Sequence, residues 1–348
     1  MYKLTSKDRL IVTFILTLKG IPGIGSKTIQ NILSKHDTEI TDAVLLDEQF
    51  ARNLSENKIS KGLETDGISW NLLEERADET IENVFGCDAG ILHPFMDDYP
   101  KRLLCNSSFP PLLFYKGDID VLNANKAVAL IGTRNPTQIG VNWGRRLTEL
   151  FVEDDYAIVS GLAIGSDTVG HQSALDVGGK TVAVLPTPID APVYPRKNME
   201  LADRILNNGG VLVTEYEPGI VMDNRQLVSN LVARDQWQPG LSDGLIALET
   251  SISGGSNHAL KHALNTKTPI AMLDYRNRKD IDFYNDVRFG GNVEYISQKG
   301  AIPIYDAAGI EFFKHCMDSY RSHIEYYVIG GLNEGVSKGH EQLTLNFE

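Results

Sequence analysis

The sequence predicts an α/β fold: a Rossmann-like, doubly wound and mostly parallel sheet that follows an all-helical, helix-hairpin-helix-like N-terminal domain. Two observations predict this fold. From about residue 91 to 325, short apolar runs alternate with helical patterns, whereas the pattern before residue 90 is helical throughout. Continuous apolar strands that alternate with helices are typical of a parallel sheet covered on both faces. The apolar runs cover 127–131, 157–159, 181–185, 211–213, 245–248 and 269–273, and the helical patterns between them cover 141–152, 167–177, 197–208 and 256–265.

These patterns divide the chain into three predicted segments. Residues 1–90 are expected to form the helical domain, residues 91–325 the Rossmann-like domain, and residues 326–348 a flexible tail. The tail is polar and contains glycines, which is typical of a linker. Within the helical domain, Gly, Pro and polar breaks separate amphipathic stretches at 6–19, 26–35, 40–53 and 69–84.

The composition narrows the classes of function. The chain has 348 residues with 33 Lys and Arg against 46 Asp and Glu, a formal net charge of -13. This charge argues against a broad basic surface that coats nucleic acid, although it does not exclude a local basic patch. The 3 cysteines lack CxxC spacing, so we expect no disulfide framework, no metal and no cofactor, and a cytoplasmic location. Because no stretch approaches the roughly 20 apolar residues of a membrane span, and the run at 10–18 lacks a cleavage signal, we expect no membrane role.

The stretch from residue 18 to 32 is typical of two helices joined by a Gly-rich turn. Gly23 and Gly25 permit a tight hairpin, and the N–H groups at the start of the second helix can hold a DNA phosphate beside Lys27. This pattern predicts helix-hairpin-helix architecture. A plain αα-hairpin with a Gly-rich turn explains the same residues, so the pattern leaves DNA contact open.

Three of the predicted strands end in Gly-rich loops that open helices. Glycine allows a phosphate to approach the backbone, and a helix N-terminus attracts an anion. Because the C-terminal ends of parallel strands meet at one edge, we expect a shared phosphate site, although connecting turns explain each loop alone. The loop residues are Gly132, Thr133 and Arg134 after the first strand, Ser160, Gly161, Gly165 and Asp167 after the second, and Gly254, Gly255, Ser256 and Asn257 after 245–248. Arg196, Lys197 and Arg234 are expected to add positive charge, while Trp237 is either a base-stacking or a packing residue.

Asp167, His171 and Glu249 are the candidate acid and base groups of an alternative, enzymatic interpretation. Asp167 and His171 are four residues apart, so they share one face of a helix. Helix capping by Asp167 and an ordinary helical histidine explain the same pair. Because no Ser or Cys nucleophile motif accompanies them, we favour a protein without catalytic activity.

In their order along the chain, these motifs resemble the DNA-processing protein A family, also called Smf. The matching residues are Tyr99-Pro100, the stretch 109–118, Ile131-Gly-Thr-Arg134, Ser160-Gly-Leu-Ala163 with Asp167 and His171, Tyr194-Pro195 with Asn198, the stretch 214–219, Gly240-Leu-Ser-Asp243 and Gly254-Gly-Ser256. The resemblance implies single-stranded DNA in the cleft, a homodimer and a RecA-type recombinase as partner. The Gly-rich loop at 254–256 and Arg234 are also similar to the Gly-rich loop and the upstream arginine of the lysine-decarboxylase-like nucleotide-binding proteins.

The chain departs from the family pattern at two loops. Residues 163–167 read Ala-Ile-Gly-Ser-Asp where the family has Ala-Arg-Gly-Ile-Asp, and residues 234–238 keep only the first arginine of Arg-Asn-Arg-Ile-Ile. We also recognise no winged-helix domain of the kind that the family carries at its C-terminus. Two basic residues are therefore missing from the expected phosphate track.

The tail contains Gln342, Leu345 and Phe347 at the spacing Q-x-x-L-x-F, which resembles the bacterial sliding-clamp binding peptide. An extended peptide with these side chains would fill an apolar pocket. A packed terminal strand explains the same residues.

The sequence therefore predicts a single-stranded DNA-binding protein of DNA processing or recombination, with phosphates held by the strand-end loops. The alternative is a nucleotide sensor, or an N-glycosidase-type enzyme, that uses the same cleft. A third interpretation is an adaptor that recruits a partner to the clamp.

Overall fold

The computed structural model describes residues 4–54, 58–106 and 108–333. Within them a nine-stranded sheet has the order β1-β2-β6-β5-β4-β3-β7-β8-β9. The strands are β1 (Gly90–Leu92), β2 (Leu113–Gly117), β3 (Lys126–Ile131), β4 (Tyr156–Ser160), β5 (Thr181–Val184), β6 (Val211–Thr214), β7 (Gly244–Ala247), β8 (Ile270–Leu273) and β9 (Ile302–Ile304). The strands from β6 across to β9 pair in parallel, while β2 pairs antiparallel with both β1 and β6.

The predicted α/β class with a mostly parallel sheet is confirmed. Each predicted apolar run is a strand whose ends lie within one or two residues of the prediction. The sequence pattern missed β1, β2 and β9. These strands lie at the two ends of the sheet, β1 and β9 are only three residues long, and β9 contains Pro303, so none shows a long apolar run.

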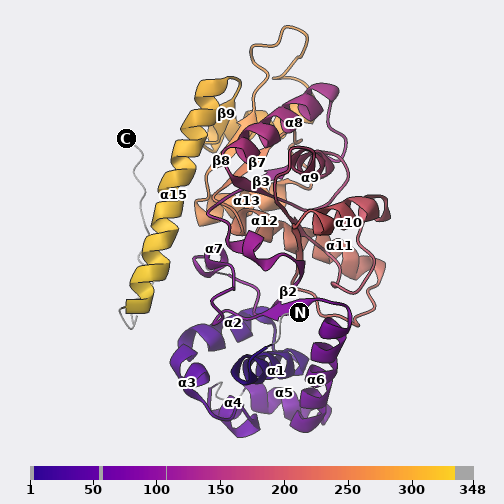
Figure 1. Ribbon diagram of the computed structural model, residues 1–348, viewed down its shortest axis with the longest axis vertical. Coiled ribbons are helices and arrows are strands. Elements are labelled where there is room, and N and C mark those ends of the chain that lie inside the picture. The colour runs from indigo at the N-terminus through magenta and orange to yellow at the C-terminus, as the bar shows by residue number, and fades with distance from the viewer. Residues whose placement is uncertain (1–3, 55–57, 107, 334–348) are drawn as a thin grey trace.

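Helices cover both faces of the sheet, as the doubly wound pattern requires (Figure 1). Along β3, Val128 and Leu130 pack into the core on one face, and Ala127, Ala129 and Ile131 pack into the core on the other, because side chains alternate along a strand. The helices of this part are α7 (Lys101–Leu104), α8 (Gln138–Glu153), α9 (Ser166–Asp176), α10 (Met199–Asn207), α11 (Asn224–Ala233), α12 (Trp237–Gly240), α13 (Asn257–Thr266), α14 (Gly290–Gln298) and α15 (Ala307–Asn333), with short 3-10 turns at η1 (Ile119–Asn123), η2 (Arg196–Asn198), η3 (Arg234–Gln236) and η4 (Val287–Phe289).

In residues 4–54 and 58–86 helices are the only regular elements, and they gather at the lower end of the molecule in Figure 1. These helices are α1 (Ser6–Gly20), α2 (Ser26–Lys35), α3 (Asp37–Asp42), α4 (Glu48–Leu54), α5 (Lys58–Asp66) and α6 (Trp70–Gly86). The single helix expected over 40–53 is wrong. The Ala43 backbone is extended after α3, and the Asp47 carboxylate accepts a hydrogen bond from the N–H of Phe50 at 2.8 Å, which starts a new helix.

An ion pair and a hydrogen bond attach the helical region to the α/β part. Lys19 on α1 lies 2.6 Å from Glu217, which follows β6, and His93 Nε2 lies 3.1 Å from the Asp8 carboxylate. Burial lowers the pKa of His93 to about 4 although Asp8 favours the charged form. His93 is therefore neutral at physiological pH, and its contact with Asp8 is a hydrogen bond of a neutral ring.

Helix α15 extends past the expected start of the tail at residue 326 and ends at Asn333. Phe313, Met317 and Ile324 are buried and pack the helix against the α/β part. The helix continues through Gly330 and Gly331, although each glycine disfavours a helix by about 1 kcal/mol. The possible clamp-binding residues Gln342, Leu345 and Phe347 lie outside the described residues. None of the helices in 4–54, 58–106 and 108–333 combines the length and apolar character that crossing a membrane requires.

Candidate nucleic-acid interface

The loops that follow β3, β4 and β7 meet at the C-terminal edge of the sheet. The N–H of Thr133 donates to the carbonyl of Glu249 at 2.7 Å, and the N–H of Ser166 donates to the carbonyl of Thr133 at 3.1 Å. From β3 the chain builds the sheet outward through β4, and it later returns to the other side of β3 with β7. Such a switch in strand order is where doubly wound sheets bind ligands. The structure therefore brings the three predicted Gly-rich loops together.

Gly165 allows the β3 and β4 loops to approach closely. Its φ is +87°, a backbone conformation that residues other than glycine rarely adopt. A Cβ atom there would lie 2.5 Å from the carbonyl oxygen of Thr133. Arg134 follows at the exposed tip of the β3 loop, and the structure gives it no ion pair among the described residues. Ile164, where the family pattern has arginine, is 40% exposed beside this loop.

Asp167 and His171 are buried, and their side chains accept hydrogen bonds from the backbone of the β4 loop. The Asp167 carboxylate accepts hydrogen bonds from the N–H groups of Gly161 at 3.1 Å and Ala163 at 3.2 Å. His171 accepts from the N–H of Leu162 through Nε2, and its Nδ1 donates to the Thr181 hydroxyl, because that hydroxyl itself donates to the carbonyl of Ile158. Burial lowers the pKa of His171 to about 3, so the ring stays neutral.

The Glu249 carboxylate is also hydrogen-bonded to neighbouring groups of the fold. Its carboxylate accepts from the N–H of Thr137 at 2.8 Å, the Thr137 hydroxyl at 2.6 Å and the Tyr275 hydroxyl at 2.7 Å. Glu249 is 1% exposed, Asp167 6% and His171 0%. Because all three candidate acid and base groups are buried and bonded, the geometry favours structural roles for them.

Arg234 is buried as well, at 3% exposure, and ties two strand ends together. Its Nη1 donates to the carbonyl of Gly161 and, at 2.6 Å, to that of Val184. A Cβ atom at Gly161 would collide with the guanidinium, so this glycine leaves room for the arginine. Nε of Arg234 lies 3.1 Å from Asp235. The buried guanidinium of Arg234 therefore holds the backbone after β4 and at the end of β5 together.

Asp235 carries a charge that the fold disfavours. Burial raises its pKa to about 7, while the guanidinium groups of Arg234 and Arg134 oppose the rise. The unfolded chain releases this proton near the ordinary value of 3.8, so between about pH 4 and 7 the folded protein holds a proton that the unfolded chain lacks. The stability contribution of Asp235 therefore falls as the pH rises through this window.

Asp235→Asn is expected to raise the free energy of unfolding at pH 8 by at least about 1.4 kcal/mol, which corresponds to one pKa unit. The gain should shrink toward pH 4, where Asp235 is protonated in the folded protein and increasingly in the unfolded chain. Urea unfolding of the two proteins at pH 4, 6 and 8 measures it. A gain that is the same at all three pH values would contradict the account.

The loop after β7 is shaped by one side chain. The Asn257 amide donates to the carbonyls of Ser251, Ile252 and Gly254 at 2.8–3.0 Å. Gly255 is exposed, and a Cβ atom there would meet nothing within 4 Å. Asn257 therefore holds the loop in which Gly254, Gly255 and Ser256 lead into α13.

The remaining predicted residues lie in three places. Arg196 and Lys197 are exposed on η2, next to buried Asn198, whose amide donates to the carbonyl of Leu162 in the β4 loop at 2.8 Å. Trp237 is a packing residue: it is 2% exposed, and its Nε1 donates to Glu215 at 2.8 Å. Gly23, Gly25 and Lys27 are exposed at the turn between α1 and α2, and Gly23 has a φ of +81°.

Sequence reasoning missed the segment 274–289, which follows β8 on the same edge. It holds Arg276, Arg278 and Arg288, and each of them forms an ion pair with a nearby aspartate of the same segment. Tyr284 in this segment is 64% exposed. The cluster of arginines directly after an apolar run was the available signal.

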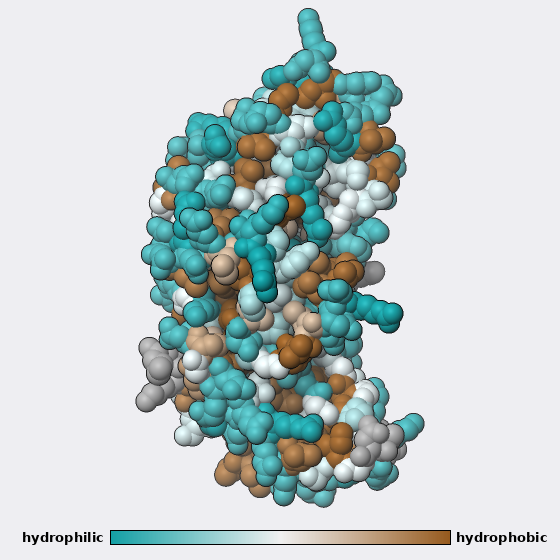
Figure 2. Space-filling view, turned by 90° about the vertical axis from the view of Figure 1, so that its right-hand side faces the viewer, coloured by the Kyte–Doolittle hydropathy of each residue, from teal (hydrophilic) through white to brown (hydrophobic). Residues whose placement is uncertain are grey.

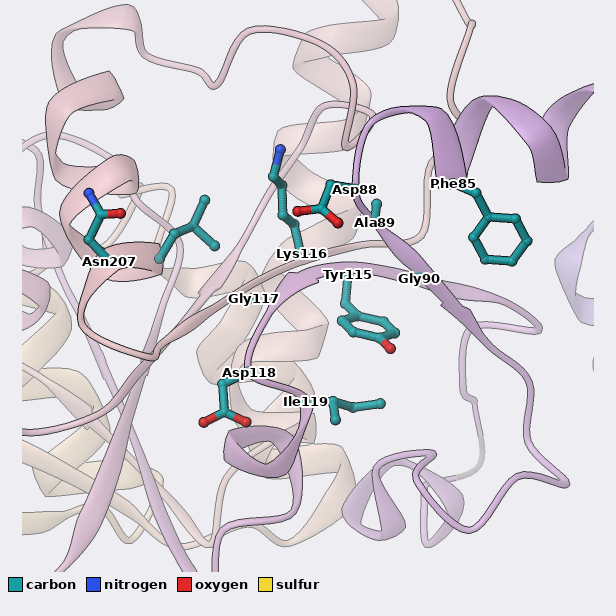
Figure 3. Close-up of a pocket in the computed structure, with 11 residues that line it drawn as sticks. Phe85, Asp88, Ala89, Gly90, Tyr115, Lys116, Gly117, Asp118, Ile119 and Asn207 are labelled. Atoms are coloured by element: carbon teal, nitrogen blue, oxygen red, sulfur yellow. The ribbon is translucent and has the colours of Figure 1, made fainter. Parts of the chain in front are cut away.

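A cavity of about 640 Å³ lies away from these loops, beside the antiparallel strands β1 and β2 (Figure 3). Asp88, Lys116 and Asp118 are among its lining residues. The Lys116 ammonium donates to the carbonyl of Cys87 at 3.0 Å, and Asp118 accepts from the N–H of Asp120 at 3.2 Å. Lys116 and Asp118 therefore bond the local backbone. Within the described residues, no group of three His, Cys, Asp or Glu side chains could hold a metal ion.

The family model of DNA recombination-mediator protein A matches residues 90–310, more than half of the chain. The chain belongs to this family. The match begins at β1 and ends in α15, so it contains the whole sheet and all three strand-end loops. The DNA recombination-mediator protein A family is the one that the ordered motifs predicted.

Relatives and solved structures agree with this membership. Protein Smf of Synechocystis sp. is 32% identical over 227 residues, which cover 62% of this chain and 55% of that protein. DNA processing protein DprA of Streptococcus pneumoniae is 38% identical over 160 residues, covering 46% of this chain and 54% of that protein. The chain thus spans about half the length of the curated relatives that it matches.

The fold is shared with two solved family members. The structure of DNA processing protein A from Streptococcus pneumoniae aligns with a TM-score of 0.65 at 23% identity, covering 89% of this chain and 98% of that one. The structure from Helicobacter pylori, which describes the single-stranded DNA binding mode of that protein, aligns with a TM-score of 0.55 at 24% identity, covering 67% and 97%.

Proposed function

We propose that this chain binds single-stranded DNA along the edge formed by the loops after β3, β4 and β7, and that it acts in DNA processing or recombination. The observation that carries the proposal is the junction of the three loops through the Thr133–Glu249 and Ser166–Thr133 hydrogen bonds, with exposed Arg134 beside it. Family membership supports DNA as the ligand, and the DNA-binding mode described for the Helicobacter pylori protein supports the single-stranded form.

Backbone N–H groups and a few exposed cations hold the phosphates in this proposal. Arg134, Arg196 and Lys197 are exposed around the β4 loop. Amides at glycine loops and helix N-termini attract anions without a positive net charge. A chain of net charge -13 can therefore bind DNA here, although weakly and with strong dependence on salt.

In this proposal the buried polar residues act on the shape of the site. Asp167, His171 and Arg234 shape the β4 loop from inside, so they would position the amides and leave the DNA contact to exposed residues. The hairpin residues Gly23, Gly25 and Lys27 remain a candidate second phosphate contact. A homodimer, a RecA-type recombinase and a sliding clamp remain predicted partners.

Titration of an oligothymidylate against thymidine monophosphate tests this function. We expect the oligonucleotide to bind and to lose affinity steeply between roughly 50 and 200 mM salt, since each phosphate contact on a single strand adds about 0.7 to the slope of log K against log salt. The mononucleotide should not compete at equal nucleotide concentration. Equal affinity for the mononucleotide, or release of free base during incubation, would support the nucleotide-binding alternative instead.

A further inference from the structure

Two carboxylates lie beside Arg234 beneath the proposed DNA edge. The Nε atom of Arg234 lies 3.1 Å from the carboxylate of Asp235. Gly161, whose carbonyl accepts from Arg234, donates its own N–H to the Asp167 carboxylate at 3.1 Å. The Asp235 side chain is 15% exposed, while Arg234 and Asp167 are almost fully buried. When both carboxylates are ionised, this cluster of Arg234, Asp167 and Asp235 therefore holds one negative charge in excess, next to the loops that are proposed to bind phosphates.

The two carboxylates differ in their hydrogen bonds. Asp167 accepts from two backbone N–H groups of the β4 loop, and such bonds stabilise the ionised form of a carboxyl group. Asp235 accepts from the Gln238 amide at 3.1 Å, while the nearby Nε–H of Arg234 has no hydrogen-bond partner among the described residues. Burial raises the pKa values of both carboxyl groups, that of Asp235 to about 7. Asp235 is therefore the carboxyl group of the cluster that more readily takes up a proton.

The charge of Asp235 acts on the residue that is proposed to hold a phosphate. Arg134, at the exposed tip of the β3 loop, is close enough to oppose the rise of the Asp235 pKa. By the same interaction, an ionised Asp235 weakens the attraction of Arg134 for a phosphate and repels the phosphate. Figure 2 shows the side of the molecule that carries α10 and α11, where hydrophilic residues predominate between smaller apolar patches. Charges on such a surface are screened by solvent and salt, whereas a mostly buried carboxylate is screened much less.

Other ionisable groups lie around Asp235. Tyr216, after β6, interacts with it, and burial raises the pKa of Tyr216, so this hydroxyl stays neutral. Burial lowers the pKa of His262 on α13, which favours its neutral ring. The helices that pack against η3 are α11, α12 and α13, and their remaining charged or titratable residues are Arg225, His258 and Lys261. A change at Asp235 alone leaves all of these groups in place, so a comparison of two proteins isolates its contribution.

We propose that Asp235 takes up a proton from the solvent when a phosphate of the single strand binds beside Arg134, and that it thereby lowers the affinity for DNA as the pH rises. This inference rests on the proposed function. The added proton removes the excess negative charge of the cluster, so the protonated form binds a phosphate more tightly. The family pattern has asparagine at this position, where the chain has Asp235. A neutral amide cannot take up this proton, so the acidic residue would give the chain a pH dependence that the family pattern does not encode.

The affinity for oligothymidylate at pH 6, 7 and 8 and constant salt tests the proposal in the full chain. If the bound strand favours protonated Asp235 tenfold, the affinity of the parent falls about fivefold from pH 6 to pH 8, since the free protein loses the proton near pH 7. Asp235→Asn is expected to lack this fall and to bind about fivefold more tightly than the parent at pH 8. The control is Asp120→Asn, which removes an exposed carboxylate on η1, just before β3 begins, and should follow the parent.

Titration calorimetry at pH 7, in two buffers of different ionisation enthalpy, counts the protons taken up on binding. With the same tenfold preference, the parent should take up about 0.4 proton more than Asp235→Asn. Equal pH dependence or equal uptake in the two proteins would overturn the proposal and leave the DNA edge intact. Weaker binding by Asp235→Asn at all three pH values would also overturn it, because the carboxylate would then position Arg234. No uptake by the parent would do so without any variant, and failure of the parent to bind the oligonucleotide at any pH would reject the proposed function itself.

Discussion

Replacing Arg234 with alanine is expected to lower the free energy of unfolding by about 3–5 kcal/mol, the range found when one partner of a buried ion pair is removed. The change would leave the carbonyls of Gly161 and Val184 without their donor. The carboxyl groups of Asp167 and Asp235, whose pKa values the guanidinium lowers against the effect of burial, would lose their counter-charge. Urea unfolding followed by circular dichroism measures the loss.

The matched control is Arg225→Ala on α11, which removes the same side chain from an exposed position. It is expected to change the stability by no more than about 0.5 kcal/mol. Gly161→Ala should also destabilise the protein, because its Cβ atom would collide with the same guanidinium. An Arg234→Ala protein as stable as the parent but deficient in DNA binding would show that Arg234 contacts the strand directly, contrary to its burial.

Arg134→Ala is expected to lower the affinity for oligothymidylate by at least about tenfold, because an arginine hydrogen bond to a charged phosphate contributes about 1.5–3 kcal/mol and 1.4 kcal/mol is a factor of ten. The variant should also reduce the salt slope by about 0.7, the contribution of one phosphate contact on a single strand. Arg134 is exposed and the structure gives it no ion pair among the described residues, but its charge opposes the rise of the Asp235 pKa, so the unfolding free energy at pH 8 should fall by no more than about 0.5 kcal/mol. Fluorescence anisotropy at several salt concentrations measures both quantities.

Lys299→Ala controls for the loss of one positive charge. Lys299 is exposed at the C-terminal end of α14, away from the strand-end loops, and should leave the affinity and the salt slope unchanged. The converse variant Ile164→Arg restores a basic residue that the family pattern has and should strengthen binding. An Arg134→Ala protein with the parent's affinity and salt slope would remove the β3 loop from the interface.

The sheet was predictable from the sequence because its central strands are buried on both faces and read as continuous apolar runs. The edge strands β1 and β9 and the neighbouring strand β2 gave no such signal, since they are short or pair antiparallel. The stretch 40–53 looked like one helix because its amphipathic period continues across the break that Asp47 caps. The spacing of apolar residues identifies helices and strands well, but it locates their ends less accurately.

The convergence of the three loops was also predictable, because parallel strands place their C-terminal ends on one edge. The different burial of Arg134 and Arg234 was not predictable. Both are arginines near predicted strand ends, but one lies at an exposed tip and the other under the β4 loop at 3% exposure. Burial depends on packing between distant segments, here between residue 234 and residues 161 and 184, which a local motif does not encode. The burial of Asp167 and His171 under the β4 loop depends on packing in the same way.

Hydrogen exchange of backbone amides, with and without saturating oligothymidylate, tests most directly whether the strand-end edge binds single-stranded DNA. We expect slower exchange on DNA addition in peptides that cover 132–137, 161–166 and 250–257, with no change near the C-terminal end of α14. Unchanged exchange in all three loops, with slowing confined to other parts of the chain, would contradict the proposed interface.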